Sequence, residues 1–445
     1  MVITAVLFAT MSALEEPAPS APRDLPEFSR AALEETSAQA DASRVSTWEA
    51  IRQRATQLGI AASLVYDGQG VVNASGGQRT GSVYLGNFHM MLTLDGDRLL
   101  GWPGATLFLN GLVNHGGHPS DLVGDAQGVS NLDAPPGAQL YEAWFQQNLF
   151  ENRFSALVGR YDLNTEFYRL QSATLFVNSS FGVGPEFSQS GVGGPSIFPD
   201  TSVGLRIAFK PAKDVIIRAA VLNGAPVDRP DGGHRIFAEG DGALLVGEAA
   251  LLTRMVPEDR PLNARFRIGR NSGLPPYEDK IAVGGWYYTA QFNDLSEQQP
   301  NGQPVRHSGS AGLYLLADET LLRCCDSSAR QINAFGQFGL GDSRVNRFGW
   351  YLGGGLVFSG FFPTLENDEL GLAVAIARNG SHFIEQQREN SVPATGTETT
   401  LELTYLLQAG KHLAIQPDLQ YVIQPGTDPT RKNALVVGLR FELAY

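Results

Sequence analysis

The feature that most constrains the fold is a regular alternation of apolar and polar side chains over segments of about ten residues. In residues 435–445 every second residue is apolar, while Arg440 and Glu442 fall on the other face. The same pattern recurs at residues 401–408, 413–423 and 203–210. Successive side chains of a strand point to opposite faces, so each segment predicts a strand with one apolar and one polar face. Strands of a soluble β-sandwich alternate too, but they are usually ~5–6 residues long. The pattern therefore favours a transmembrane β-barrel, with a sandwich as the alternative.

The sequence contains no apolar run that could cross a membrane as a helix, which takes roughly 18 or more residues. Its residues are 43% hydrophobic and 18% charged. Backbone groups find no hydrogen-bond partners in lipid, so a chain that crosses without helices must close its strands into a barrel. The same pattern therefore predicts an all-β fold whose apolar face meets lipid.

About seventeen segments have strand character, among them residues 263–270, and bacterial single-chain barrels have an even number of strands. We predict a transmembrane antiparallel β-barrel of sixteen strands, a size that leaves an aqueous channel. No internal repeat is visible, which indicates one barrel domain over residues 60–445.

The N-terminal part predicts two short regions before the barrel. Residues 1–30 combine a signal-like apolar stretch with a flexible spacer, although no Lys or Arg precedes Arg23. Residues 31–59 contain apolar residues at helical spacing up to Gly59. We expect a short helix there, at the periplasmic mouth of the barrel.

Residues 162–201 form the longest gap between two predicted strands. A segment of this length without secondary structure is usually functional. In a barrel with an open lumen it would fold inward and narrow the pore. The predicted residues of this constriction loop are Phe167, Phe176, Asn178, Phe181 and Phe187.

The phase of the alternation also selects candidates for the wall of the channel. Polar residues at inward positions would offer hydrogen bonds to hydroxyl groups, and arginine adds five permanent donors. The predicted pore-lining residues are Asp95, Asn110, Glu142, Trp144, Gln146, Asn148, Arg206, Arg218, Arg265 and Arg267. The opposite face would carry Tyr141, Phe145, Tyr287, Phe348, Trp350, Phe358, Tyr405, Tyr421 and Tyr445, as in the aromatic girdles of membrane barrels.

Several stretches of the chain resemble the carbohydrate-selective porin family, OprB type. They include WEAIRQRATQLG at residues 48–59, LDGDRLLGWPGA at 94–105, LYEAWFQQNLF at 140–150 and VGRYDLN at 158–164. SGGQRTG at 75–81, FVNSSFG at 176–182 and the run from 398 to 445 complete the similarity. The resemblance implies a sixteen-stranded barrel in the outer membrane of a Gram-negative bacterium. It also implies passive diffusion of glucose-like monosaccharides, with small neutral sugars and membrane lipid as partners.

Other functions remain open at this stage. A general or anion-preferring porin is the nearest alternative, and a barrel enzyme or a structural or adhesive barrel is more remote. The formal net charge of −13 argues against nucleic acid as a partner. His115 and His118 lack an evident third metal ligand, and no G-x-S-x-G nucleophile motif occurs. We therefore predict neither an enzyme nor a metal or cofactor, and leave open whether the barrel is a homotrimer or a monomer.

Overall fold

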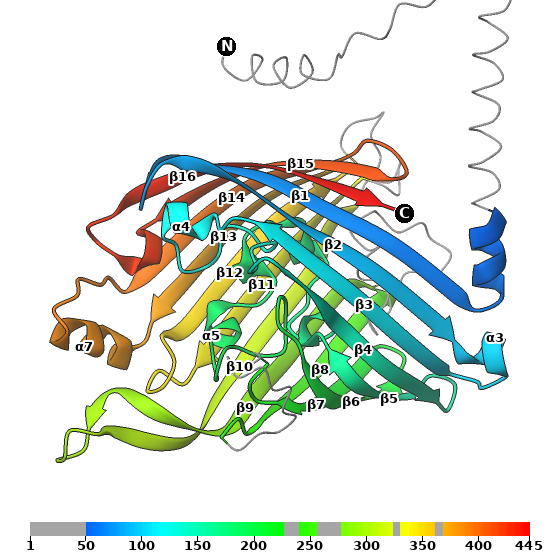
Figure 1. Ribbon diagram of the computed structural model, residues 1–445, viewed down its shortest axis with the longest axis horizontal. Coiled ribbons are helices and arrows are strands. Elements are labelled where there is room, and N and C mark those ends of the chain that lie inside the picture. The colour runs from blue at the N-terminus through cyan, green and yellow to red at the C-terminus, as the bar shows by residue number, and fades with distance from the viewer. Residues whose placement is uncertain (1–49, 227–239, 256–276, 324–329, 361–367) are drawn as a thin grey trace, which may run out of the picture. The chain divides into compact units, whose positions relative to one another are not determined.

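Antiparallel strands pair in sequence order and close into a ring in the computed structural model (Figure 1). The structure describes residues 50–226, 240–255, 277–323, 330–360 and 368–445. Residues 1–57 and 58–445 form two separate units. In the first, residues 50–57 are helical, as predicted, and their placement at the periplasmic mouth stays a prediction. Residues 1–49, including the signal-like segment, lie outside the described residues.

The barrel contains sixteen strands, the number predicted. Their bounds are β1 Ile60–Gly77, β2 Gly81–Asp95, β3 Ala105–Gly116, β4 Gly137–Leu149, β5 Phe154–Tyr161, β6 Ser202–Ala212, β7 Val215–Asn223, β8 Ala243–Met255, β9 Tyr277–Gln298, β10 Pro304–Arg323, β11 Gln331–Gly341, β12 Phe348–Ser359, β13 Glu369–Asn379, β14 Thr397–Gln408, β15 Leu413–Ile423 and β16 Lys432–Ala444. The additional predicted strand at 263–270 lies outside the described residues, and β8 pairs directly with β9.

Short helices occupy the connections between strands. They are α3 Gly96–Leu100, α4 Ser120–Val123, α5 Pro185–Ser188 and α7 Ser381–Glu389, with the 3₁₀ turns η1 Leu163–Thr165, η2 Ser172–Leu175, η3 Ser179–Phe181 and η4 Pro425–Thr427. Among the described residues, no helix is both long and apolar enough to pass through a membrane. In Figure 1, α3 lies at one end of the strands and α7 at the other. The connections at the α7 end include the two long ones, residues 117–136 and 162–201, which bear on the site.

The first and last strands complete the ring. β16 pairs with β1 along most of its length, from Val65 opposite Ala444 to Gly77 opposite Lys432. Beyond the last pair, the backbone N–H of Leu64 donates to the Tyr445 carbonyl at 3.0 Å, and the reverse bond measures 2.9 Å. The chain terminus is therefore hydrogen-bonded into the barrel wall.

Side chains on the two faces of the wall alternate as predicted. Unlike in a soluble protein, the apolar side chains lie on the exposed outer face and the polar ones are buried inside. Leu439 and Leu205 are 54% and 50% exposed, whereas Gln420 and Arg206 are at most 1% exposed. Soluble proteins seldom bury charged residues while exposing a continuous apolar band. This arrangement fits a barrel with lipid outside and a polar interior.

Placing a charge on the outer face should reveal this orientation. We expect Leu439→Arg, near the middle of β16, to destabilise the barrel by about 2–4 kcal/mol, because the guanidinium would enter hydrocarbon. Leu439→Met keeps an apolar side chain at the same place and should cost far less. Reversible unfolding from lipid vesicles measures both variants, and equal losses would mean that Leu439 does not face lipid.

A β-bulge in β4 makes one exception to the predicted faces. Asn110 pairs with Glu142, but the next residue, Gly111, pairs with Leu140, which leaves Tyr141 as the extra residue. A bulge lets two successive residues share one face. Tyr141 and Glu142 are therefore both buried inside, and the prediction that Tyr141 lies on the outer face is wrong. Phe348, at a register shift in β12, is also buried at 1% exposure instead of lying on the outer face.

Candidate functional site

The 162–201 loop crosses the barrel interior and is tied to distant strands by inward-facing carboxylates. Glu248 of β8 accepts the backbone N–H of Tyr168 at 3.0 Å. Asp318 of β10 accepts the N–H and hydroxyl of Ser172 at 3.0 and 2.6 Å. Glu402 of β14 accepts the N–H groups of residues 177 and 178 at 2.6 and 3.0 Å. Asn178 is fully buried there and also donates to Gln420 at 3.2 Å. The carboxylates replace the hydrogen bonds that the loop backbone would otherwise make with water.

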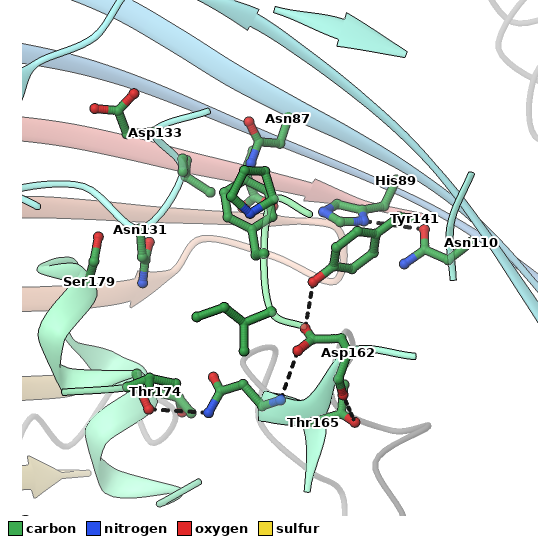
Figure 2. Close-up of a pocket in the computed structure, with 18 of the residues that line it drawn as sticks. Asn87, His89, Asn110, Asn131, Asp133, Tyr141, Asp162, Thr165, Thr174 and Ser179 are labelled. Carbon is green, nitrogen blue, oxygen red and sulfur yellow. Dashed lines mark hydrogen bonds between the residues drawn. The ribbon is translucent and has the colours of Figure 1, made fainter. Parts of the chain in front are cut away.

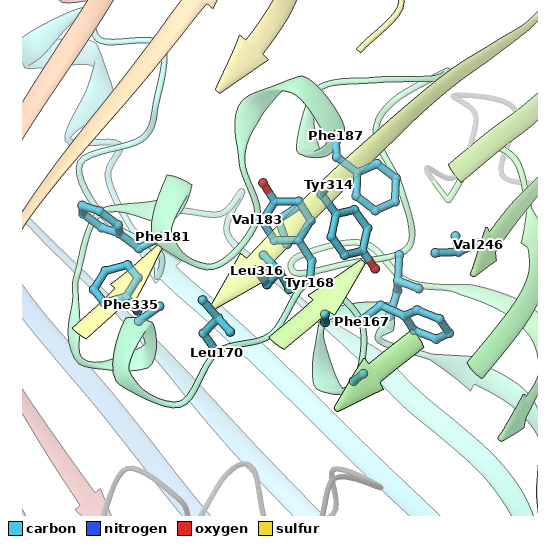
Figure 3. Packing of buried hydrophobic residues seen from close by; sticks show 14 of the residues in the cluster. Phe167, Tyr168, Leu170, Phe181, Val183, Phe187, Val246, Tyr314, Leu316 and Phe335 are labelled. Carbon is cyan, nitrogen blue, oxygen red and sulfur yellow. The ribbon is translucent and has the colours of Figure 1, made fainter. Parts of the chain in front are cut away.

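The phenylalanines of this loop pack against the wall rather than facing open space (Figure 3). Phe187 stacks on Trp286 with ring centroids 4.2 Å apart. Phe176 and Phe181 lie 5.4 and 5.9 Å from Phe335 of β11. These three loop rings and Phe167 are each at most 1% exposed. These rings therefore hold the predicted constriction loop against the wall, because their burial removes apolar surface from water.

Arg206 and Arg218 also hold the loop instead of facing the channel. Arg206 Nε lies 2.7 Å from Glu166 of the loop, and Arg218 Nε lies 3.8 Å from the same carboxylate. Both arginines are 1% exposed, and neither lines the cavity that the loop encloses against the wall. Burial alone would raise the pKa of Glu166, but Arg206 and Arg218 outweigh it and hold that pKa below its ordinary value. The predicted role of these two arginines in lining the pore is thus replaced by a role in fixing the loop.

Behind the same loop, Glu186 is an acid without a cationic partner in the described part of the chain. It is fully buried in α5, and its Oε1 accepts the Tyr168 hydroxyl at 2.8 Å. Burial raises the pKa of Glu186 to about 7. On the wall beside it is Gly339 of β11, where any side chain would collide with the carboxylate.

A second loop, residues 117–136, also folds inward and was not predicted from the sequence. Glu398 of β14 accepts the N–H groups of Ala126 and Gln127 at 2.8 and 3.0 Å. Ser130 donates to Gln69 of β1 at 2.7 Å. Asn131 donates to the Phe176 carbonyl at 3.2 Å and so joins the two loops. A signal was present in the sequence, since the connection between β3 and β4 is long for a surface turn.

Between the two loops and the wall lies a cavity of about 500 Å³ (Figure 2). Its wall residues come from β1–β4 and β14–β16, and its other side is formed by both loops. Small-molecule sites commonly have volumes of about 300–1,000 Å³. The polar and aromatic side chains that line it include Asp67, Asn87, His89, Phe108, Asn110, Tyr141, Glu142, Trp144, Asp162 and Arg440.

The structure places some of the predicted pore-lining residues at this cavity and others elsewhere. Asn110, Glu142 and Trp144 lie on its wall. Gln146 and Asn148 are half-buried further along β4, where Gln146 accepts a bond from Arg206 at 2.7 Å. Arg265 and Arg267 lie outside the described residues.

Asp95 does not lie on the channel wall. It ends β2 at the barrel rim, where its carboxylate accepts the N–H groups of Asp97 and Arg98 and caps α3. An Asp in the N-cap position satisfies backbone donors that the short helix leaves free. The alternation predicted that the Asp95 side chain points inward, but it could not show that β2 ends at this residue.

Paired side chains organise the cavity wall. His89 Nδ1 and Asn110 Oδ1 are 3.3 Å apart, and the Trp144 indole N–H donates to Glu142 at 3.3 Å. Trp144 also packs on Phe108 with centroids 5.0 Å apart. The Tyr141 hydroxyl donates to Asp162 of the loop at 2.5 Å, a contact visible in Figure 2. The wall thus presents an aromatic surface beside amide, imidazole and carboxylate groups.

Comparison with known proteins gives consistent matches over most of the chain. The family described as "Carbohydrate-selective porin, OprB family" matches residues 79–445. Porin B of Pseudomonas aeruginosa is 24% identical over 434 residues, covering 89% of this chain and 90% of that protein. The high-pH structure of Pseudomonas putida OprB superposes with a TM-score of 0.78 at 22% identity, covering 89% of this chain and 97% of that one. The outer-membrane channel DcaP of Acinetobacter baumannii gives a TM-score of 0.50 at 9% identity, covering 87% of this chain and 97% of DcaP.

Proposed function

The chain belongs to the carbohydrate-selective porin family OprB and is an outer-membrane porin, and we propose that it passes small neutral sugars of glucose size by passive diffusion. The observation that carries this proposal is the cavity wall between the two inward loops. There Trp144 and Phe108 form an aromatic surface directly beside Glu142 and Asn110. The family and the closed barrel indicate a channel rather than an enzyme.

The chemistry of the wall matches the two kinds of surface on a hexose. The ring faces of a hexose carry C–H groups, which pack on aromatic side chains, while its rim carries hydroxyls. Carboxylate and amide oxygens accept hydrogen bonds from those hydroxyls, and amide and imidazole N–H groups donate to them. A sugar that passes the wall can thus exchange its bonds with water for bonds with Glu142, Asn110 and His89. Such contacts favour sugars over other solutes of equal size without requiring tight binding.

We further propose that the two loops set the width of the channel. Both are tied to the wall by buried carboxylates, so their position does not depend on the solute. Rigid positioning lowers the cost of ordering the site when a sugar enters. The anion-preferring alternative was based on arginines in the lumen. Because Arg206 and Arg218 pair with Glu166, much of the basis for that alternative is lost.

Substitution of Trp144 tests the proposal. We expect Trp144→Ala to weaken the block of ion current by glucose by about fivefold to tenfold, the equivalent of ~1 kcal/mol for one aromatic contact. Trp144→Phe keeps a ring on Phe108 and should retain most of the block. The measurement is glucose titration of single-channel current in planar bilayers. Unchanged block in Trp144→Ala would show that sugars do not use this wall.

A further inference from the structure

Glu186 is a buried acid of the 162–201 loop that takes no part in the cavity wall. It lies in α5 and is 0% exposed. α5 packs against β11 and β12, while Val183, just before α5, and Ser188, at its end, border the cavity. This short segment thus has the barrel wall on one side and the cavity on the other. A charge that appears on Glu186 therefore acts on the contact between the loop and the wall.

Two glycines of β11 form a notch in the wall that receives α5. A Cβ atom at Gly339 would overlap Glu186 Oε1, and one at Gly341 would lie 3.1 Å from the Glu186 carbonyl oxygen. Glycine in a strand often marks a site where another part of the backbone approaches closely. The close fit keeps the carboxyl group away from bulk water. An ionised carboxylate is costly in such a place unless it is paired with a cation.

The side chains in direct contact with this carboxyl group are neutral. The Tyr168 hydroxyl of the same loop donates to Oε1 at 2.8 Å. In the described part of the chain, Oε2 has no donor other than the backbone N–H of Glu186 itself. Tyr314 of β10 packs on Tyr168 with ring centroids 4.5 Å apart, and both rings are visible in Figure 3. Tyr351 of β12 and Oε2 both lie against Gly184, so these contacts supply rings and hydroxyls but no positive charge.

The cations of the surrounding elements have partners of their own. Lys280 of β9 lies 3.0 Å from Glu248 of β8. Arg344, just beyond β11, lies 2.7 Å from Asp342. Among the described residues, no charged side chain stabilises the ionised form of Glu186.

These surroundings determine how Glu186 titrates. Burial raises its pKa from an ordinary value of 4.5 to about 7, and the opposing effects come from the Tyr168 hydroxyl and its own backbone N–H. Asp318 and Glu402, the wall acids that bind other parts of the loop backbone, bring no positive charge either. A carboxyl group whose pKa is higher in the docked loop than in water favours docking when it is protonated. Docking of α5 therefore weakens as the pH rises from about 5 to about 7, and it changes little above that range.

We propose that loss of the proton on Glu186 releases α5 from the barrel wall and makes the channel close intermittently at neutral to alkaline pH. The inference rests on the proposed role of the loop in setting the width of the channel. Water can solvate the carboxylate only after α5 leaves the notch at Gly339. Because β11 and β12 close off the outer side, the released segment moves toward the cavity that Val183 and Ser188 border. There it narrows the passage for ions and sugars.

Single-channel recording in planar bilayers tests this switch at about pH 5 and about pH 8, on both sides of the range in which docking changes. In the wild type we expect the closed fraction of the recording time to rise roughly tenfold or more, because a difference of one pKa unit corresponds to a factor of ten. Glu186→Gln has nearly the same shape but no proton to lose, so its closed fraction should stay at the acidic value at both pH values. Glu385→Gln removes an exposed acid of α7 and should behave like the wild type.

Tyr168→Phe changes the same site in the opposite direction. It removes the hydroxyl that favours the ionised carboxylate, so closures at about pH 8 should be more frequent than in the wild type, with no change at about pH 5. If Glu186→Gln does not assemble, the wild type and Tyr168→Phe decide the question. A closed fraction that is independent of pH in the wild type, or that rises equally in Glu186→Gln, would overturn the switch. Because the readout is ion current, failure of glucose to permeate or block would refute the proposed sugar function while the pH-dependent closures still support the switch.

Discussion

Deletion of residues 439–445 is expected to abolish insertion of the barrel into membranes. These residues pair on one side with β1, from Gly70 to Val65, and on the other with β15, from Pro417 to Leu413. Their removal breaks the ring at the junction of its first and last strands. In hydrocarbon each backbone group left without a partner costs several kcal/mol. A full set of such groups exceeds the net stability of a typical protein, about 5–15 kcal/mol.

A matched deletion at the tip of the β9–β10 hairpin serves as the control. Removing residues 297–303 takes away the same length of chain, but from a hairpin that extends beyond the neighbouring strands in Figure 1. This variant should insert and conduct. Protease protection and heat-modifiable migration on gels report insertion for both. A truncated chain that inserts correctly and conducts would show that β16 is not needed to close the ring.

Replacing residues 183–194 with a short Gly-Ser linker is expected to widen the channel and weaken its interaction with sugar. Val183, Ser188 and Gly193 all border the cavity, so their removal joins it to a larger space. We expect ion conductance to rise roughly twofold or more, since a barrel of this size encloses a wide aqueous lumen once its constriction is removed. Glucose block should fall at the same time, because the sugar would no longer be held against Trp144 and Asn110.

The barrel itself should survive the loop replacement. In the described residues, the hydrogen bonds between strands do not involve residues 183–194. The main loss is the packing of Phe187 on Trp286 and the bond between Tyr168 and Glu186. The hairpin deletion at 297–303 again provides a control of similar kind. If conductance and glucose block both stay at wild-type values, the loop does not limit the channel.

The fold could be predicted because alternation is a property of the sequence itself. β14 has Leu401 and Leu403 on one face and Glu402 on the other, so its sequence already indicates which face meets lipid. Register and closure follow from the same pattern, since a shift of one residue would move charges into lipid. The exceptions arise where the pattern is interrupted, as at the bulge that brings Tyr141 inside and at the strand end where Asp95 caps α3.

The site was harder to predict because the side chains of a loop obey no period. The sequence indicated that residues 162–201 enter the lumen, but not which side of the loop faces water. Its phenylalanines pack on Trp286 of β9 and Phe335 of β11, and Glu166 pairs with Arg206 and Arg218. The sequence predicted an inward loop that contains Glu166 and, separately, inward arginines at 206 and 218, and this combination was the available signal for their pairing. The 117–136 loop was not predicted because it is much shorter than the 162–201 loop, and length was the feature that indicated an inward loop.

In the proposed mechanism, sugars diffuse through the interior of this barrel past the wall of Trp144, Glu142 and Asn110. The most direct test is swelling of liposomes that contain the purified full-length protein, with neutral sugars of increasing size as solutes. We expect rapid entry of glucose and other hexoses, slower entry of disaccharides, and little entry of larger oligosaccharides, without any energy source. Absence of swelling with glucose in liposomes that contain inserted barrels, or equal rates for sugars of every size, would contradict it.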